Sequence, residues 1–168
     1  NSYSDHPKEP GDTALPTKPA ATSDILCRLS EAILDDLQKQ MKPDFPKLTC
    51  IPEDKAGQEH DGESNSVSCQ IKKVSSSMEA YSSPAYYLTP PIDDLWHNTI
   101  YLNEPNITDD LTLYTTLSHE GYPGHLYQTV YSQSFLNQQN ASCIRSMLHY
   151  GGFVEGWAVY VENLSYGY

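Results

Sequence analysis

The chain has 168 residues and carries 10 Lys and Arg against 22 Asp and Glu, so its formal net charge is −12. This length allows about one domain. The acidic balance argues against nucleic-acid binding, which needs clustered positive charge, and no apolar run approaches the ~20 residues that cross a bilayer. The sequence begins without methionine or a signal-peptide pattern, so we expect an internal piece of a longer protein.

The first 22 residues differ in composition from the rest of the chain. Residues 1–22 combine proline and polar residues with almost no apolar anchors, which predicts a linker or a disordered tail. We therefore expect the folded domain to occupy residues 23–168.

An amphipathic helix is predicted at the start of this domain. Apolar residues recur at helical spacing over residues 25–41, Ser23 can cap the helix, and Pro43 can end it. The residues that follow, 53–68, are polar and without periodicity, which predicts a loop.

The four cysteines form no C-x-x-C pair, which argues against thioredoxin-like redox chemistry and against a zinc ribbon. Cys50 and Cys69 flank the polar, acidic loop. Two alternatives stay open: the two residues close this loop as a disulfide in an oxidising compartment, or they are free thiols in a reducing one.

Short strands are predicted in the middle of the chain. Aromatic and β-branched residues at 85–88 and 99–102 are separated by a loop that contains Pro90 and Pro91, a pattern typical of an edge hairpin. Residues 71–74 form a further strand candidate.

The second half of the chain reads as helical. Thr108 offers a capping hydroxyl before two acids, which predicts a helix that runs to about residue 120. Further helices are expected over residues 125–136 and 153–164. These elements combine several helices with a few short strands, which is an α+β pattern.

The segment H-E-G-Y-P-G-H at residues 119–125 contains the candidate metal-binding and catalytic residues. Zinc peptidases commonly use H-E-x-x-H, in which both imidazoles lie on one helix face. Here the histidines are six residues apart, and on an unbroken helix the second would be rotated by ~240° and raised by ~9 Å. The two imidazoles could then not share one metal ion.

The residues between the histidines indicate how they could converge. Pro123 lacks an N–H, so the carbonyl of His119 loses its helical partner. Gly121 and Gly124 permit unusual backbone dihedrals, and we expect the helix to break here and restart at His125. The alternative is a capping histidine and a surface histidine on either side of a proline kink.

A third metal ligand is available further along the chain. Glu155 lies on a separate predicted helix, and two histidines with one glutamate leave a fourth position open for water. Glu120 would act as general base. Glu162 could support a ligand from behind, although a solvent-facing acid is the alternative, and His149 could be a supporting residue, another ligand or an ordinary turn residue.

Four segments together resemble the bacterial family called domain of unknown function 885. They are S-P-A-Y-Y at 83–87, Y-L-N at 101–103, H-E-G-Y-P-G-H at 119–125 and E-G-W-A at 155–158. The family's members resemble gluzincin-type zinc metallopeptidases and are usually much longer than this chain. The resemblance implies that residues 23–168 are part of a metallopeptidase-like catalytic domain. Its expected fold is α+β and mostly helical, with gluzincin-like active-site helices and a small β-hairpin or sheet alongside.

The same resemblance implies a role for individual residues. It assigns His119, His125 and Glu155 as Zn²⁺ ligands and Glu120 as the catalytic base. Many relatives have a second histidine directly after the motif, where this chain has Leu126.

The strand segments of the resemblance supply candidates for substrate binding. In gluzincins an edge strand binds the substrate backbone, so Tyr86, Tyr87 and Asn103 are candidate cleft residues, with core tyrosines as the alternative for the two Tyr.

We therefore expect a zinc-dependent peptide-bond hydrolase core that acts on a peptide substrate. Two alternatives remain: a metal-binding fragment that is catalytically incomplete, and a non-catalytic module that binds basic peptides in a Tyr-rich acidic cleft. The resemblance slightly favours an extracytoplasmic location, as an exported protein or lipoprotein, over a cytoplasmic one.

Overall fold

The computed structural model describes residues 20–48, 67–91, 93–148 and 150–168. The predicted tail 1–22 lies outside this part except for its last three residues, which belong to a helix. Cys50 and His149 also lie outside the described residues.

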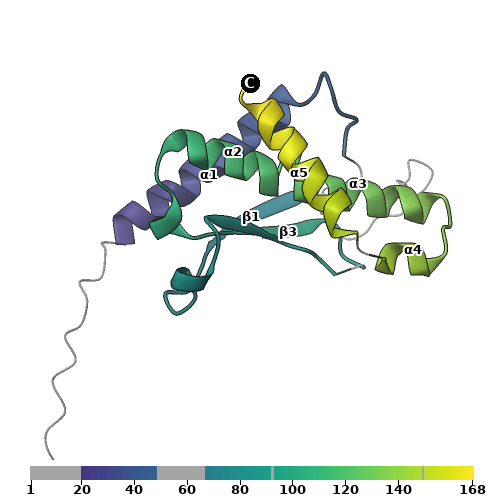
Figure 1. Cartoon of the computed structure of the whole chain (residues 1–168), viewed down its shortest axis with the longest axis horizontal. Coiled ribbons are helices and arrows are strands. Elements are labelled where there is room, and N and C mark those ends of the chain that lie inside the picture. Colours follow the sequence, from purple (N-terminus) through teal and green to yellow (C-terminus); the bar gives the residue numbers. More distant parts are fainter. Residues whose placement is uncertain (1–19, 49–66, 92, 149) are drawn as a thin grey trace, which may run out of the picture.

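The described chain is a mixed α+β structure in which helices hold more residues than strands (Figure 1). The α-helices are α1 Ala20–Gln40, α2 Asp110–Glu120, α3 His125–Gln138, α4 Cys143–Met147 and α5 Gly151–Ser165. The strands are β1 Ser68–Lys73, β2 Ala85–Leu88 and β3 His97–Leu102, with short 3-10 turns η2 Glu79–Tyr81 and η3 Glu104–Asn106.

The three strands form one sheet in the order β1-β3-β2. The predicted hairpin is confirmed, because β2 pairs antiparallel with β3 and places Tyr87 opposite Ile100. Strand β1 pairs with β3 in parallel, which the sequence did not indicate, and it begins at Ser68 rather than at residue 71. A parallel pair needs a long crossover connection, and residues 74–96, which include β2, provide it.

Helices α1, α2, α3 and α5 lie on one side of the sheet (Figure 1). Their apolar faces and the sheet share one buried core, which includes Leu34, Leu37, Ile100, Leu102, Leu113, Leu117, Leu126 and Val130. Of the apolar residues that predicted α1, Leu37 and Met41 are buried in this core and Leu26 and Ile33 pack against it, whereas Ile25 and Leu29 are exposed.

Several helix ends differ from the predictions. Helix α1 starts at Ala20, before the predicted cap Ser23, and ends at Gln40, before Pro43. The cap of α2 is Asp109 rather than Thr108, because the Asp109 carboxylate accepts from the Thr112 N–H at 2.8 Å while the Thr108 hydroxyl donates to it. Helix α4 was not predicted, since five residues are too few to show a period.

Cys69 is a free thiol on β1. Burial raises its pKa to about 12, so the thiol stays protonated at neutral pH. Within the described residues, no helix has the length and apolar character that a bilayer-spanning segment requires.

Candidate metal centre

The chain breaks its helix between the two histidines, as the sequence predicts. Helix α2 ends at Glu120 and α3 begins at His125. The break brings the two imidazoles together: the ring centroids of His119 and His125 are 4.8 Å apart, with an interplanar angle of 85°.

At this break the backbone of Gly124 lies so close to the carbonyl groups of Ser118 and His119 that only glycine fits. A Cβ at this position would lie 1.8 Å from the carbonyl oxygen of His119 and 2.3 Å from that of Ser118. Both glycines have negative φ, −107° at Gly121 and −76° at Gly124, so space rather than a left-handed conformation explains them. The compact turn depends on the absence of a side chain.

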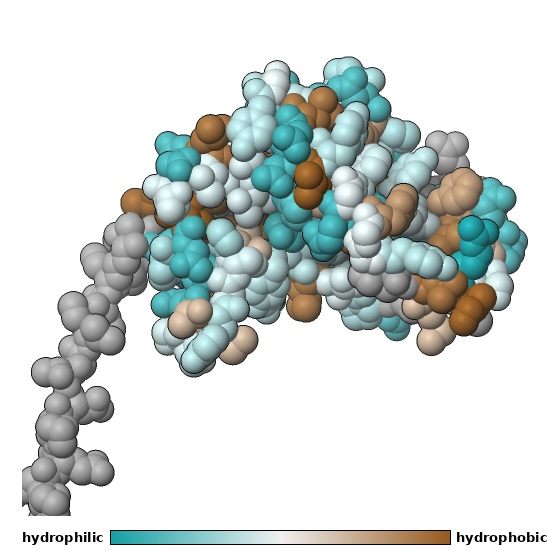
Figure 2. Space-filling model, in the orientation of Figure 1, coloured by the Kyte–Doolittle hydropathy of each residue, from teal (hydrophilic) through white to brown (hydrophobic). Residues whose placement is uncertain are grey.

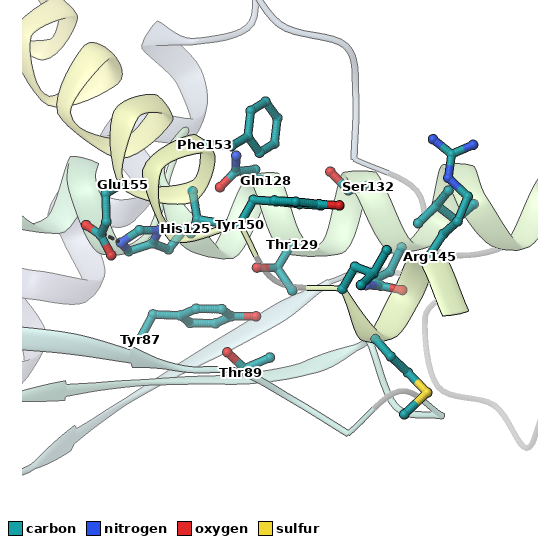
Figure 3. A pocket seen from close by; sticks show the side chains of 15 residues that line it. Tyr87, Thr89, His125, Gln128, Thr129, Ser132, Arg145, Tyr150, Phe153 and Glu155 are labelled. Atoms are coloured by element: carbon teal, nitrogen blue, oxygen red, sulfur yellow. Dashed lines mark ion pairs between the residues drawn. The ribbon is translucent and has the colours of Figure 1, made fainter. Parts of the chain in front are cut away.

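Helix α5 brings Glu155 to the histidines. The Glu155 Oε2 atom lies 3.6 Å from Nε2 of His119 and 3.6 Å from Nε2 of His125. Figure 3 shows Glu155 beside His125. Ligands at the usual zinc bond lengths of about 2.0–2.1 Å stand roughly 3.3 Å apart at the corners of a tetrahedron. The two separations from Glu155 are therefore close to those that a tetrahedral zinc site needs.

Glu162, on the same helix, lies behind His119. Its Oε2 accepts from Nδ1 of His119 at 2.9 Å. An ionised carboxylate can only accept, so Nδ1 of His119 carries a proton, and Nε2 is the ring nitrogen that faces Glu155. This is the arrangement that commonly orients a metal-ligating imidazole, and it excludes the alternative of an acid that only faces solvent.

Two further hydrogen bonds fix α5 against the break. The Ser118 hydroxyl donates to the Val161 carbonyl at 3.3 Å, and the Trp157 indole N–H donates to the Pro123 carbonyl at 2.8 Å. The sequence interpretation missed this role of Trp157, although the tryptophan stands inside the E-G-W-A segment. It positions the helix that carries both acids.

Glu120 lies beside the histidines and is held by the sheet. Its Oε2 accepts from the backbone N–H of Tyr87 at 2.8 Å, and ligand atoms of His119, Glu120 and His125 all lie within 4.8 Å of one another. Burial raises the pKa of Glu120, although the Tyr87 N–H and His119 act in the opposite direction. A carboxylate with a raised pKa beside two imidazoles can accept and return a proton.

A cavity of about 550 Å³ adjoins these groups. His125 and Glu155 line it together with the side of α3, residues of α4 and of the segment that leads into α5, and the end of β2 (Figure 3). Its volume lies in the range of sites that bind small molecules or short peptide segments.

Of the three predicted substrate-binding residues, Tyr87 lies in this cavity and the other two do not. The ring of Tyr86 stacks on that of Tyr101 at 5.1 Å, on the sheet face opposite to Tyr87, because side chains alternate along a strand. Asn103 is fully buried, and its Nδ2 donates to the carbonyls of Glu79 and Ser82. Asn103 therefore holds the turn before β2 rather than a substrate.

Leu126 is also fully buried in the core and does not line the cavity. This position therefore faces the core and not the cavity. His149 lies outside the described residues, so its predicted role stays a prediction.

The comparisons with known proteins agree with this fold. It is similar to the crystal structure of "the putative lipoprotein from Colwellia psychrerythraea", with a TM-score of 0.67 and 19% sequence identity over 89% of this chain. The chain spans 23% of that protein. No curated protein matches the sequence.

The family comparison covers nearly the whole chain. The sequence pattern of a family described as "Bacterial protein of unknown function (DUF885)" matches residues 17–168, which include every helix and strand of the described structure. The chain belongs to the bacterial DUF885 family.

Proposed function

We propose that this chain forms the zinc centre of a peptide-bond hydrolase, with His119, His125 and Glu155 as ligands and Glu120 as general base. The observation that carries the proposal is the position of the Glu155 Oε2 atom, 3.6 Å from Nε2 of both histidines. Two imidazoles and one carboxylate are a donor set that zinc prefers in catalytic sites, where a further position stays open.

Glu155 is a better ligand candidate than Glu120, although both acids lie near the imidazoles. One oxygen of Glu120 already accepts from the Tyr87 N–H, and this contact ties the carboxylate to the sheet edge. Glu155 is more exposed, at 64% of its side chain, and its Oε2 is equidistant from the two Nε2 atoms. We therefore assign proton transfer to Glu120 and metal binding to Glu155.

When bound, zinc would polarise the scissile carbonyl and favour deprotonation of the attacking water. The chain's own residues divide the remaining work. Glu162 holds His119 with Nε2 directed toward Glu155, and the Tyr87 N–H holds Glu120 in place. Glu120 takes a proton from the water and delivers it to the leaving amine.

The peptide substrate is proposed from the cavity beside Glu155 and from the neighbouring strand edge. The backbone of strand β2 lies beside the site at Tyr87. An extended peptide could lie along this strand. An extracytoplasmic location is proposed as well, supported by the name of the structural neighbour.

Zinc loading and peptide hydrolysis test the proposal. After incubation with zinc and dialysis, we expect equimolar metal by mass spectrometry of the wild-type chain, and cleavage of members of a peptide library. His125→Ala should lose the metal, because two remaining ligands bind zinc poorly. His97→Ala is the matched control, since His97 is an exposed histidine that pairs with Asp94.

Two results would contradict parts of this function. Wild-type protein without stoichiometric zinc excludes the metal centre. Equimolar zinc without cleavage of any peptide instead favours a metal-binding chain that needs further segments for turnover, and 23% coverage of the structural neighbour makes this the second candidate.

Glu162→Gln should weaken zinc binding without removing a ligand. The amide is a poorer acceptor for the Nδ1–H of His119, so we expect a 10- to 100-fold loss of zinc affinity with the fold retained. Competition with a chelating dye measures the affinity, and circular dichroism checks the fold. An unchanged affinity would show that the contact has no effect on the imidazole.

A further inference from the structure

The cavity beside the proposed metal centre contains one cationic side chain. Arg145, on α4, is the single Lys or Arg among the described residues that line it, and Figure 3 shows it at the end away from Glu155 and His125. From position 74 to the end of the printed sequence, Arg145 is the only Lys or Arg, against nine Asp and Glu. The cavity therefore holds the one Lys or Arg of an otherwise acidic part of the sequence.

Arg145 has no acidic partner within the described part of the chain. The ion pairs there involve Lys73, His97, His119 and His125, and none includes Arg145. With no acidic partner among the described residues, the Arg145 guanidinium can meet an anionic ligand. Its planar guanidinium can donate two parallel hydrogen bonds to a carboxylate.

The wall between the two ends of the cavity is polar. One face of α3 lines the cavity with four polar residues at helical spacing: His125, Gln128, Thr129 and Ser132. Gln128 is only 8% exposed, and among the described residues neither its carboxamide oxygen nor its nitrogen has a hydrogen-bond partner. Buried amides are rarely left unpaired, so the Gln128 carboxamide is a candidate partner for a polar group or a water molecule in the cavity.

The rim of the cavity is apolar. Exposed hydrophobic residues gather at the end of the molecule that carries α4, where Figure 2 shows the brown surface, and they include Met147, Leu148 and Tyr150. Arg145 itself is exposed, so a long side chain or chain end that passes this rim can reach its guanidinium.

We propose that Arg145 binds a carboxylate of the peptide substrate while the scissile bond lies at the other end of the cavity. This inference rests on the proposed function and adds to it a substrate class, peptides that carry a negative charge on the α4 side. The carboxylate could be the C-terminal one or that of an Asp or Glu side chain. Both present the same two oxygens to the guanidinium.

Peptide binding to the metal-free chain tests this proposal separately from hydrolysis. Three labelled peptides of one neutral sequence would be compared by fluorescence anisotropy in chelator: one with a free C-terminus, one amidated, and one amidated with an internal glutamate. We expect wild type to bind at least one carboxylate-bearing peptide about fivefold to tenfold more tightly than the neutral amide. The peptide that gains affinity identifies the source of the carboxylate.

Arg145→Gln should remove this preference, and Arg145→Lys should keep part of it. Arg28→Gln on α1 is the matched control, because it makes the same change of charge outside the cavity and should keep the preference. Equal or absent binding of all three peptides to wild type, or an unchanged preference in Arg145→Gln, overturns the proposal. Because the readout needs no zinc, loss of hydrolysis alone bears on the proposed function and not on this carboxylate site.

Discussion

Replacement of Glu120 by glutamine is expected to lower the rate of peptide hydrolysis by about a thousandfold while zinc still binds. Proton transfer by a positioned side chain commonly contributes 10²- to 10⁴-fold, and an amide cannot supply it. The glutamine side-chain oxygen can still accept from the Tyr87 N–H, so the sheet contact that holds this residue should survive. Steady-state kinetics and metal analysis on the same preparation give the two readouts.

A matched acid far from the histidines controls for the change of charge. Glu79→Gln, in the short turn η2, should leave both rate and zinc content unchanged. Hydrolysis by Glu120→Gln at the wild-type rate would rule out Glu120 as the base. Loss of zinc together with loss of rate would instead indicate that Glu120 is a ligand.

Gly124→Ala is expected to cause the largest loss of stability, about 3 kcal/mol or more. The added Cβ would lie 1.8 Å from the His119 carbonyl oxygen, and backbone cannot yield as a flexible side chain can. The turn would have to open, which separates the histidines, so zinc affinity should fall with stability. Urea unfolding and metal titration measure the two effects.

Gly156→Ala is the matched control for this substitution. A Cβ at Gly156 meets no atom within 4 Å, and the residue lies inside α5. Alanine is the better helix former, so we expect a gain of about 0.5–1 kcal/mol. Equal destabilisation by both substitutions would show that the turn at Gly124 is not a tight constraint.

The sequence predicted the helical break and the residues that meet around it. Pro123 and the glycines carry a local signal, because a missing N–H and a missing Cβ act on the adjacent backbone. The convergence of Glu155 with the histidines also followed from residue types, since two imidazoles need a third donor. The geometry brings these residues together, whereas zinc and hydrolysis remain proposals.

Contacts between distant segments were harder to predict. The parallel pairing of β1 with β3 depends on register across a long connection, for which the sequence of β1 contains no marker. Asn103 and Tyr87 have similar strand contexts, yet one supports a turn and the other lies beside Glu120. Arg145 and Gln128 became candidates for ligand binding only because they line the same cavity. Their spacing along the chain does not predict this.

Both acids that contact His119 come from one helix, α5, while the imidazoles come from the segment before it. During synthesis the histidines therefore emerge well before their acidic counterparts, and Glu155 follows His125 by 30 residues. Under the proposed function, a nascent or clipped chain that lacks α5 would lack both the metal ligand Glu155 and Glu162, which orients the His119 imidazole. Such a chain could not cleave neighbouring polypeptides, so the order of the elements would itself restrain premature proteolysis.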